Sequence, residues 1–328
     1  MKAVILCAGL GTRLLPYTER IPKCMVPVAN KPILFYLLTK LVQTGVEEVA
    51  VVVHPSQEQI TTYLRKCTLP LKITIFYQAE RLGIAHALRA AEEFIGAGPF
   101  ILLLGDNLIL EPLESLCARY RTAKDLAGVL LLYEVENPSE YGVAEVEQGR
   151  VFKLVEKPAQ PKSPYVVAGA YLLPQEIFTA IKKIRPSARG EYEITDAVQF
   201  LIDEGHSFGY VLTDLSYVDV GTPKRWLLAN HQMLVANYQS RVAIGANCKF
   251  DNVKLLPPVV VGDNVMLSNA SVGPYVTIGS EAEIMNCELS ETICLSETKL
   301  DNVTLTEDIL APWSIGLNTA KERMINDD

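Results

Sequence analysis

Hydrophobic and polar positions follow two alternating patterns over residues 1–238. Short apolar runs have the length of buried strands, and the segments between them carry an apolar residue about every three or four positions, as surface helices do. The predicted strands are Ala3–Leu6, Glu48–Val53, Ile73–Tyr77, Phe100–Leu104, Gly128–Tyr133, Tyr165–Leu172 and Phe208–Leu212. The predicted helices are Ile33–Thr44, Ser56–Arg65, Ile84–Phe94, Leu113–Ala123, Pro174–Lys183, Ile194–Glu204 and a linking helix, Pro223–Tyr238.

This alternation predicts an α/β fold in which a Rossmann-like, mostly parallel sheet is covered by helices. In such a sheet the ligand binds beyond the carboxyl ends of the strands. Polar residues that directly follow a predicted strand are therefore the first candidates for a functional site.

Beyond residue 238 a 17-residue repeat replaces the helical pattern. Ile244, Val261, Ile278 and Leu295 form one column of this repeat, and Val242, Val259, Val276 and Ile293 form another. Aliphatic residues return at steps of six, five and six, which predicts triangular coils that bury their interiors only by stacking. We expect a left-handed parallel β-helix over residues 239–328, after a first domain over residues 1–238. Because Asn302 comes too early after Asn286 for the repeat and Pro312 takes the next aliphatic position, the repeat is expected to end there.

Composition narrows the class of protein. Apolar residues make up 49% of the 328 residues, and 30 basic against 38 acidic residues give a net charge of -8, so a nucleic-acid partner is not expected. The seven cysteines are scattered and never spaced C-x-x-C, as is typical of free thiols in a reducing compartment. No apolar run approaches the length of a membrane span. We therefore expect a cytoplasmic protein with no membrane partner.

A glycine-rich turn follows the first predicted strand and contains Gly9, Gly11, Thr12 and Arg13. Glycines let backbone N–H groups approach a phosphate without a Cβ in the way, and Arg13 adds positive charge. The turn is not a P-loop, since no Gly-Lys-Ser/Thr follows, and Leu14 breaks the G-x-G-x-x-G spacing. An ordinary strand-to-helix loop remains the alternative at this point.

Three charged residues could complete a phosphate and metal site. Lys23 lies in an apolar, proline-stiffened segment and could help to neutralise a triphosphate, although a solvated surface lysine is the alternative. Asp106 follows the strand Phe100–Leu104, and Asp219 also follows a predicted strand. Carboxylates at such positions suit Mg²⁺, whereas an Asx turn is the structural alternative for Asp106.

Taken together, these residues resemble the nucleotidyltransferase family that makes nucleotide sugars, most closely its long-form glucose-1-phosphate thymidylyltransferases. The resemblance covers nearly the whole chain and follows the family's order of motifs. The matching segments are Gly9–Arg13, Lys23–Val28, Gln78 with Gly83, Gly105–Asn107, Tyr141–Val143, Glu156–Pro158, Gly190–Asp196 and Asp219–Thr222.

The resemblance implies a substrate pair, a nucleoside triphosphate and a sugar 1-phosphate, with Mg²⁺ as cofactor. It implies that Gly9, Gly11, Thr12, Arg13, Gln78 and Gly83 bind the nucleotide, the last two through the base. Asp106 and Asp219 would hold the metal, and Arg13, Lys23, Asp106 and Lys157 would be catalytic. Asn107, Gly142, Glu156, Lys157, Gly169 and Tyr171 would face the sugar phosphate.

The resemblance also leaves alternatives open. Cys7-Ala8 stands where many members have small residues and an extra glycine, and Glu80-Arg81 occupies variable positions of the base loop. The expected reaction is transfer of dTMP to glucose 1-phosphate. UDP-sugar or other nucleotide-sugar synthesis is the alternative within the family, and a non-catalytic binding paralogue is the alternative outside it.

No histidine shows ligand spacing, and none follows His231. Acyltransferases built on a β-helix generally need a catalytic histidine, so the β-helix is expected to serve assembly or regulation. A homo-oligomer is the expected state.

Overall fold

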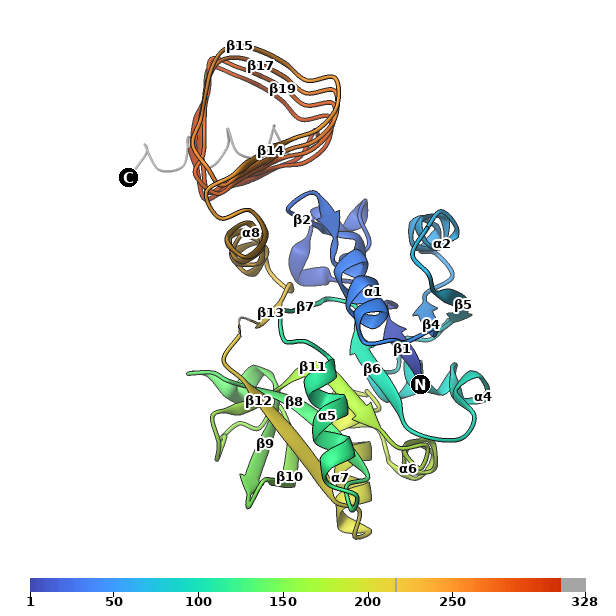
Figure 1. The fold of residues 1–328 in the computed structure, drawn as a ribbon. Coiled ribbons are helices and arrows are strands. Elements are labelled where there is room, and N and C mark those ends of the chain that lie inside the picture. Colours follow the sequence, from blue (N-terminus) through green and yellow to red (C-terminus); the bar gives the residue numbers. More distant parts are fainter. Residues whose placement is uncertain (216, 314–328) are drawn as a thin grey trace. The chain divides into compact units, whose positions relative to one another are not determined.

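The apolar runs form a nine-stranded sheet in the computed structural model, which describes residues 1–215 and 217–313. The strand order is β5-β4-β1-β6-β11-β8-β12-β10-β9 (Figure 1). All seven predicted strands are confirmed, with ends that shift by at most one residue. The bounds are β1 Lys2–Leu6, β4 Glu48–Val53, β5 Lys72–Tyr77, β6 Phe100–Leu104, β8 Gly128–Glu134, β9 Gly142–Glu147, β10 Arg150–Glu156, β11 Tyr165–Leu173 and β12 Phe208–Thr213.

The prediction of a mostly parallel sheet is confirmed in part, because the sheet is mixed. Strands β5, β4, β1 and β6 are parallel neighbours, but β11 runs antiparallel to both β6 and β8. The sequence pattern missed the hairpin of β9 and β10. Its two turn residues, Gln148 and Gly149, have φ of 50° and 77°, as a tight two-residue hairpin turn requires. Gly149 is the only residue of this turn that is typical of such hairpins, so little in the sequence indicated it.

The predicted helices are confirmed, with one break. The backbone leaves helical geometry at Ala91 (φ -100°, ψ 7°), so the segment predicted as Ile84–Phe94 is two helices. The Thr222 side chain accepts a hydrogen bond from Arg225 N and caps the linking helix, whose first residue is Pro223. The bounds are α1 Ile33–Gln43, α2 Glu58–Arg65, α3 Ile84–Arg89, α4 Glu92–Ile95, α5 Glu114–Thr122, α6 Ile177–Lys183, α7 Ile194–Asp203 and α8 Pro223–Tyr238.

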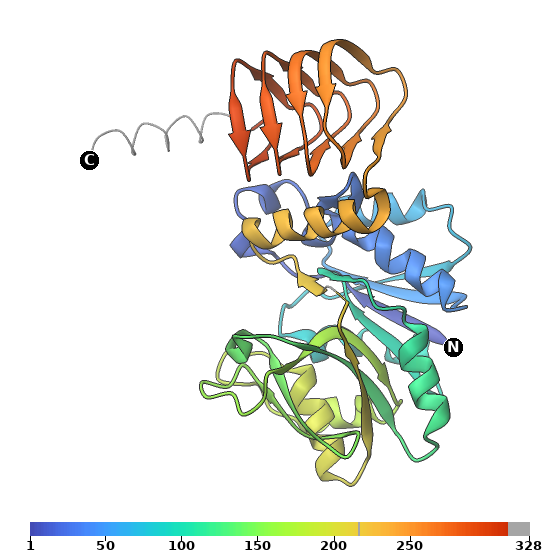
Figure 2. The same ribbon diagram turned by 60° about the vertical axis from the view of Figure 1, so that its left-hand side comes forward.

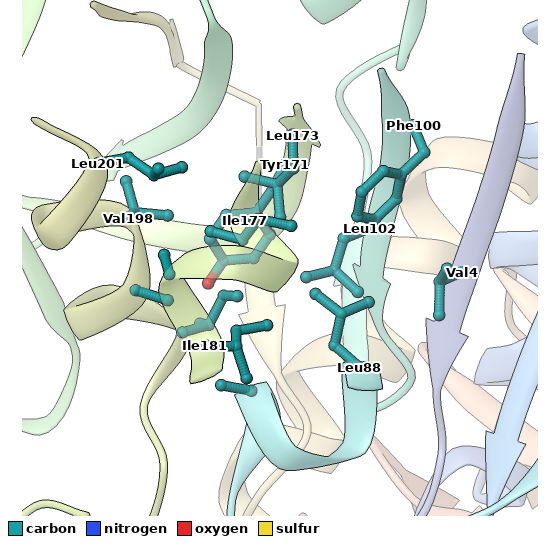
Figure 3. Close-up of a cluster of buried hydrophobic side chains, with 14 of the residues drawn as sticks. Val4, Leu88, Phe100, Leu102, Tyr171, Leu173, Ile177, Ile181, Val198 and Leu201 are labelled. Carbon is teal, nitrogen blue, oxygen red and sulfur yellow. The ribbon is translucent and has the colours of Figure 1, made fainter. Parts of the chain in front are cut away.

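Both faces of the central strands are buried, which explains why these strands are apolar. Val4 and Leu102 point into a core that α3, α6 and α7 complete with side chains such as Ile177 and Val198 (Figure 3). Alternate residues of the same strands, including Ile5, are equally buried and point to the opposite face. A functional site with polar side chains is therefore expected in the loops at the ends of the strands.

Contacts divide the chain into two compact units, and neither is a continuous segment. The first holds the sheet and comprises Met1–Leu10, Pro22–Cys24 and Ile33–Asp219. The second comprises Gly11–Ile21, Met25–Pro32 and the chain from Val220 onward. The linking helix and two loops of the N-terminal region thus group with the repeat. The boundary at residue 238 stays a prediction.

The repeat forms stacked coils of short parallel strands, which Figure 1 shows as a triangle and Figure 2 from the side. One ladder contains β14 Val242–Ile244, β16 Val259–Val261, β18 Val276–Ile278, β21 Ile293–Cys294 and β24 Ile309–Leu310. The other contains β15 Lys249–Leu255, β17 Met266–Val272, β19 Glu283–Met285, β20 Glu288–Ser290, β22 Lys299–Asp301 and β23 Thr304–Thr306. Side chains of Asn252, Asn269 and Asn286 are hydrogen-bonded in a row along the stack.

The register of the last coils corrects the predicted columns. Ile278 pairs with Cys294 rather than Leu295, so the step between coils becomes one residue shorter before Lys299. Four residues separate Val272 from Thr277, but only three separate their partners Leu289 and Ile293. Because residues 293–295 are all apolar, periodicity could not fix this slip. Leu310, not Pro312, occupies the next inward position, since it pairs with Cys294.

The two N-terminal loops of the second unit are hydrogen-bonded to the coils and to α8. The Tyr17 hydroxyl donates to Ile309 O at 2.7 Å, and Asn30 Nδ2 donates to Ile278 O at 2.6 Å. The buried Asn230 Oδ1 accepts from Ala29 N at 2.9 Å and from the Thr277 hydroxyl at 2.8 Å. The stacked coils thus support the loop that carries Gly11, Thr12 and Arg13. Within the described residues, no helix is long and apolar enough to cross a membrane.

Candidate active site

The ends of β1 and β6 bring Gly9 and Asp106 to the same edge of the sheet. Leu6 pairs with Leu104 in these parallel strands, and Gly105 N donates to Leu6 O at 2.8 Å. A Cβ on Gly105 would lie 2.6 Å from Leu6 O, so only glycine allows this approach. The residues that follow the two strands, including Gly9 and Asp106, therefore lie at the same edge of the sheet.

Asp219 reaches the same place through a separate two-stranded pairing. Strands β7 (Asn107–Ile109) and β13 (Tyr217–Asp219) are antiparallel, and Asp219 lies opposite Asn107. Asp106 immediately precedes β7. The two aspartates predicted to share a metal thus come from neighbouring strand ends.

Lys23 joins the two aspartates. Its Nζ is hydrogen-bonded to Asp106 Oδ2 and donates to Asp219 Oδ1 at 3.1 Å, across 196 residues of chain. Lys23 is 8% exposed, so it is not the solvated surface lysine that was its alternative. The structure therefore places two carboxylates around one cationic group.

The charge of Lys23 depends on these carboxylates. Burial lowers the pKa of Lys23, but the charges and hydrogen bonds of Asp106 and Asp219 outweigh it and raise the pKa above its ordinary value. Lys23 accordingly remains an ammonium at neutral pH. Because these ion pairs are mostly enclosed, removing Lys23 as the partner of either aspartate would lower the free energy of unfolding.

A divalent cation fits the same pair of carboxylates. No cluster of three or more metal-ligating side chains occurs among the described residues, but Mg²⁺ commonly takes one or two carboxylates and completes its shell with water and substrate phosphates. Lys23 Nζ shows that both carboxylates can reach one positive charge. Asp106 and Asp219 are the residues that would hold Mg²⁺.

The glycine turn offers backbone groups in a fixed conformation. Gly11 has φ of 69°, and its carbonyl accepts hydrogen bonds from Leu14 N at 2.9 Å and from the Thr18 hydroxyl at 2.8 Å. Nothing lies within 4 Å of a Cβ placed on Gly9, so the space beside it is open. Arg13 follows in the 3-10 helix Thr12–Leu14 and is exposed.

The predicted base-reading residues Gln78 and Gly83 do meet. Gln78 directly follows β5, is 6% exposed, and its Nε2 donates to Gly83 O at 3.3 Å. Gly83 has φ of 101°, and a Cβ there would lie 2.6 Å from Tyr192 O. His86 Nδ1 lies 3.1 Å from the same Gln78 nitrogen, a contact that the sequence did not suggest.

The predicted sugar-binding residues form two groups. In the first, Asn107 Nδ2 donates to Asp106 Oδ1 at 2.9 Å, and Gly169 packs directly against the Asn107 side chain. In the second, Gly142 packs on Glu156, and Lys157 Nζ lies 3.9 Å from Glu156 Oε1.

Tyr171 connects the two groups electrostatically. It is 3% exposed and packs in the core of Figure 3, so contact of its side chain with a sugar stays a prediction. Burial raises the pKa of the Tyr171 hydroxyl, and the negative charges of Glu156 and then Asp106 raise it further. The hydroxyl therefore lies in the field of both carboxylates.

A buried acidic network behind Glu156 was missed in the sequence. Glu193 accepts hydrogen bonds from the Ser187 hydroxyl and from Arg189 Nη2, both at 2.8 Å, and Thr195 donates to Glu156 Oε2 at 3.1 Å. Burial, followed by the charge of Glu193, raises the pKa of Glu156. These residues belong to the segment Gly190–Asp196 or adjoin it. That segment matched the family, but its sequence did not indicate which side chain each residue contacts.

Gly169 provides a test of how closely the site is packed. We expect Gly169→Ala to destabilise the protein by roughly 2–4 kcal/mol, because its φ is 67° and a Cβ would lie 2.6 Å from Asn107 Nδ2. Gly45→Ala is the matched control: its φ is 76°, but nothing lies within 4 Å of its Cβ, so only the backbone cost of about 1 kcal/mol applies. Urea unfolding measures both. Equal losses would show that Asn107 moves aside freely.

Comparison with known proteins identifies the family of this chain. The model of the family described as "Nucleotidyl transferase" matches residues 2–235, which include every predicted site residue. The chain belongs to the nucleotidyl transferase family. As a member of it, the chain is a nucleotidyltransferase.

Several curated relatives are similar over most of the chain. Glucose-1-phosphate thymidylyltransferase from Streptomyces antibioticus is 33% identical over 94% of this chain and 91% of its own length. Two proteins of Haloferax volcanii are each 38% identical: the low-salt glycan biosynthesis nucleotidyltransferase Agl11, over 71% of this chain and 66% of its own, and the UTP–glucose-1-phosphate uridylyltransferase AglF, over 68% and 93%. The alignment with Agl11 thus leaves about a third of that protein unmatched.

A solved structure shares the fold. A putative glucose-1-phosphate thymidylyltransferase from Bacillus anthracis, in complex with a sucrose, superposes with a TM-score of 0.65 at 31% identity. The match covers 70% of this chain and 94% of that one.

Proposed function

We propose that this enzyme transfers a nucleotidyl group, dTMP from dTTP, to glucose 1-phosphate, giving a nucleotide sugar and pyrophosphate. The observation that carries the proposal is the position of Lys23 between Asp106 and Asp219. Two carboxylates and an ammonium at the edge of the sheet suit a polyphosphate and its metal ion. The similarity to named thymidylyltransferases supports the choice of reaction.

The proposed mechanism is in-line displacement at the α-phosphorus. An oxygen of the sugar phosphate forms the new P–O bond while the bond to the β-phosphate oxygen breaks and pyrophosphate leaves. The attacking group is already an anion, so no protein nucleophile is needed. Gly9, Gly11 and Thr12 bind the phosphates, Arg13 and Lys23 stabilise the charge of the departing pyrophosphate, and Lys157 holds the sugar phosphate. When bound by Asp106 and Asp219, Mg²⁺ would neutralise phosphate charge.

Glu156 suits the sugar side of the site in this proposal. It is mostly enclosed, and its Oε2 accepts a hydrogen bond from Thr195, so its direction is fixed. A carboxylate held in this way can accept hydrogen bonds from sugar hydroxyls. Asn107, Gly142, Gly169 and Tyr171 complete the proposed sugar-binding residues.

The stacked coils have a structural role in this proposal. We infer that the stacked coils wind with the left hand and that they serve assembly and support of the Gly11–Ile21 loop rather than acyl transfer. That loop is hydrogen-bonded to the last coil through Tyr17 and Ile309. A homo-oligomeric state and a cytoplasmic location remain predictions.

Synthesis of UDP-glucose is the second candidate, and the similarity to AglF favours it. A pyrophosphate-release assay of dTTP, UTP, CTP, ATP and GTP against several hexose 1-phosphates decides between the two. We expect dTTP with glucose 1-phosphate to give the highest kcat/KM. A higher value with UTP would replace the first candidate by the second, and no release with any pair would leave the binding paralogue.

A further inference from the structure

His86 fixes which way the amide of Gln78 faces. The carbonyl oxygen of Gly83 can only accept a hydrogen bond, so the Gln78 atom 3.3 Å from it must be the nitrogen. That nitrogen also lies 3.1 Å from His86 Nδ1. Nδ1 must then accept, which requires a neutral imidazole with its proton on Nε2. Both amide hydrogens of Gln78 are therefore bound by the protein.

The remaining atom of the amide is an acceptor. Among residues 1–215 and 217–313, no side chain or backbone group is hydrogen-bonded to Gln78 Oε1. An amide locked in this orientation offers only its oxygen to a ligand. A ligand that presents an N–H there gains a hydrogen bond, whereas one that presents a lone pair is repelled.

The surroundings hold His86 in place. Gly83 O accepts from Ala87 N at 3.1 Å as well as from Gln78, so the turn before α3 is fixed at both ends. Tyr192 is tied to the same turn, because its N donates to Leu82 O at 2.7 Å and its O accepts from Ala85 N at 3.0 Å. The rings of His86 and Tyr192 stack at 6.4 Å. The imidazole thus has a defined position and a defined neighbour.

We propose that His86 is a positioning residue that makes the base site selective for bases with a ring N–H, such as thymine and uracil, over those with a ring-nitrogen acceptor, such as cytosine. The inference rests on the proposed function, in which Gln78 contacts the base. Uracil and cytosine have the same ring size and differ mainly in this edge, since N3 carries a proton in uracil and a lone pair in cytosine. Discrimination between them therefore reports the direction of the Gln78 amide rather than the size of the site.

The test compares kcat and KM for UTP and CTP, and for dTTP and dCTP, with one sugar phosphate. In His86→Ala the amide can rotate, so we expect the ratio of kcat/KM for UTP over CTP to fall roughly tenfold, mainly through KM for UTP. His86→Asn can place Oδ1 near the position of Nδ1 and accept the same hydrogen bond, so it should restore most of the ratio. His206→Ala, shortly after the end of α7, is the control and should leave it unchanged.

Each outcome bears on one claim. If the unsubstituted protein uses no nucleoside triphosphate, the proposed function fails first. If it is active but His86→Ala keeps its ratio and KM, or loses only kcat, or if His86→Asn fails to restore the ratio, the role of His86 is overturned while the function stands. Should His86→Ala fail to fold, His86→Met, which keeps the bulk but offers no nitrogen acceptor, takes its place with the same expected change.

Discussion

Replacing Asp106 with alanine is expected to lower kcat by about 10²–10³ while the protein stays folded. The site would lose one of the two carboxylates proposed to hold Mg²⁺, and Lys23 would keep only Asp219 of its two carboxylate partners. Asp106 lies after the end of β6, and the buried residues of β6 do not depend on its side chain. The hydrophobic core should therefore not change. Steady-state pyrophosphate release at saturating substrates and Mg²⁺ measures the effect, and thermal unfolding checks the fold.

Asp125→Ala is the matched control for this variant. Asp125 is also paired with a cation, Arg150, but both side chains are largely exposed, so the pair adds little to stability. We expect its kcat to match that of the unsubstituted protein. If Asp106→Ala turned over at the same rate as Asp125→Ala, the metal assignment would have to be abandoned.

Replacing Lys23 with methionine is expected to make stability depend on Mg²⁺ and to reduce kcat by a comparable factor. Without the ammonium, Asp106 and Asp219 lose the cation that they share, and breaking a buried ion pair by removing one partner costs about 3–5 kcal/mol. Because the Asp106 side chain is 32% exposed, the lower end, about 3 kcal/mol, applies. Added Mg²⁺ should recover much of this loss, since a divalent ion can take the place of the ammonium.

The loss should not vary with pH near neutrality. The pKa of Lys23 is raised, so the stabilisation is complete below the ordinary lysine pKa and is lost only as the pH rises through the higher folded value. Thermal unfolding with and without Mg²⁺, between about pH 6 and 9, measures both effects. Lys182→Met is the control, because Lys182 forms an exposed ion pair with Glu92. An Mg²⁺ response equal to that of Lys182→Met would show that Lys23 does not sit at the metal site.

The sequence predicted the local elements well because burial is periodic along the chain. Runs such as Phe100–Leu104 and the amphipathic pattern of Ile194–Glu204 report which side of an element is buried, and the structure confirms both. The hydrophobic pattern could not predict strand direction or register, because a strand is equally buried whichever way it runs. It could not show that β11 runs antiparallel to β6, or that Cys294 rather than Leu295 pairs with Ile278.

The candidate site divides in the same way. Residue type and position were enough to select Lys23, Asp106 and Asp219, because phosphate and metal chemistry requires charged side chains near the ends of strands. Gln78 and Gly83 were selected only through the resemblance to the family. No role was predicted for His86, Arg189 or Glu193, since a lone histidine has no distinctive spacing and a matching segment does not say which side chains its residues contact. Their importance comes from the side chains that they contact.

By itself, the sequence determined most of the strands and helices, the presence of a repeat and the family that the chain resembles, since periodicity and motif order are properties of the chain. Only the tertiary structure decided that one ammonium joins two aspartates that lie far apart along the chain, and that a histidine holds the Gln78 amide. The physical reason is that hydrogen bonds and charge pairs depend on distances in space, which the direction and register of the strands set and which spacing along the chain does not.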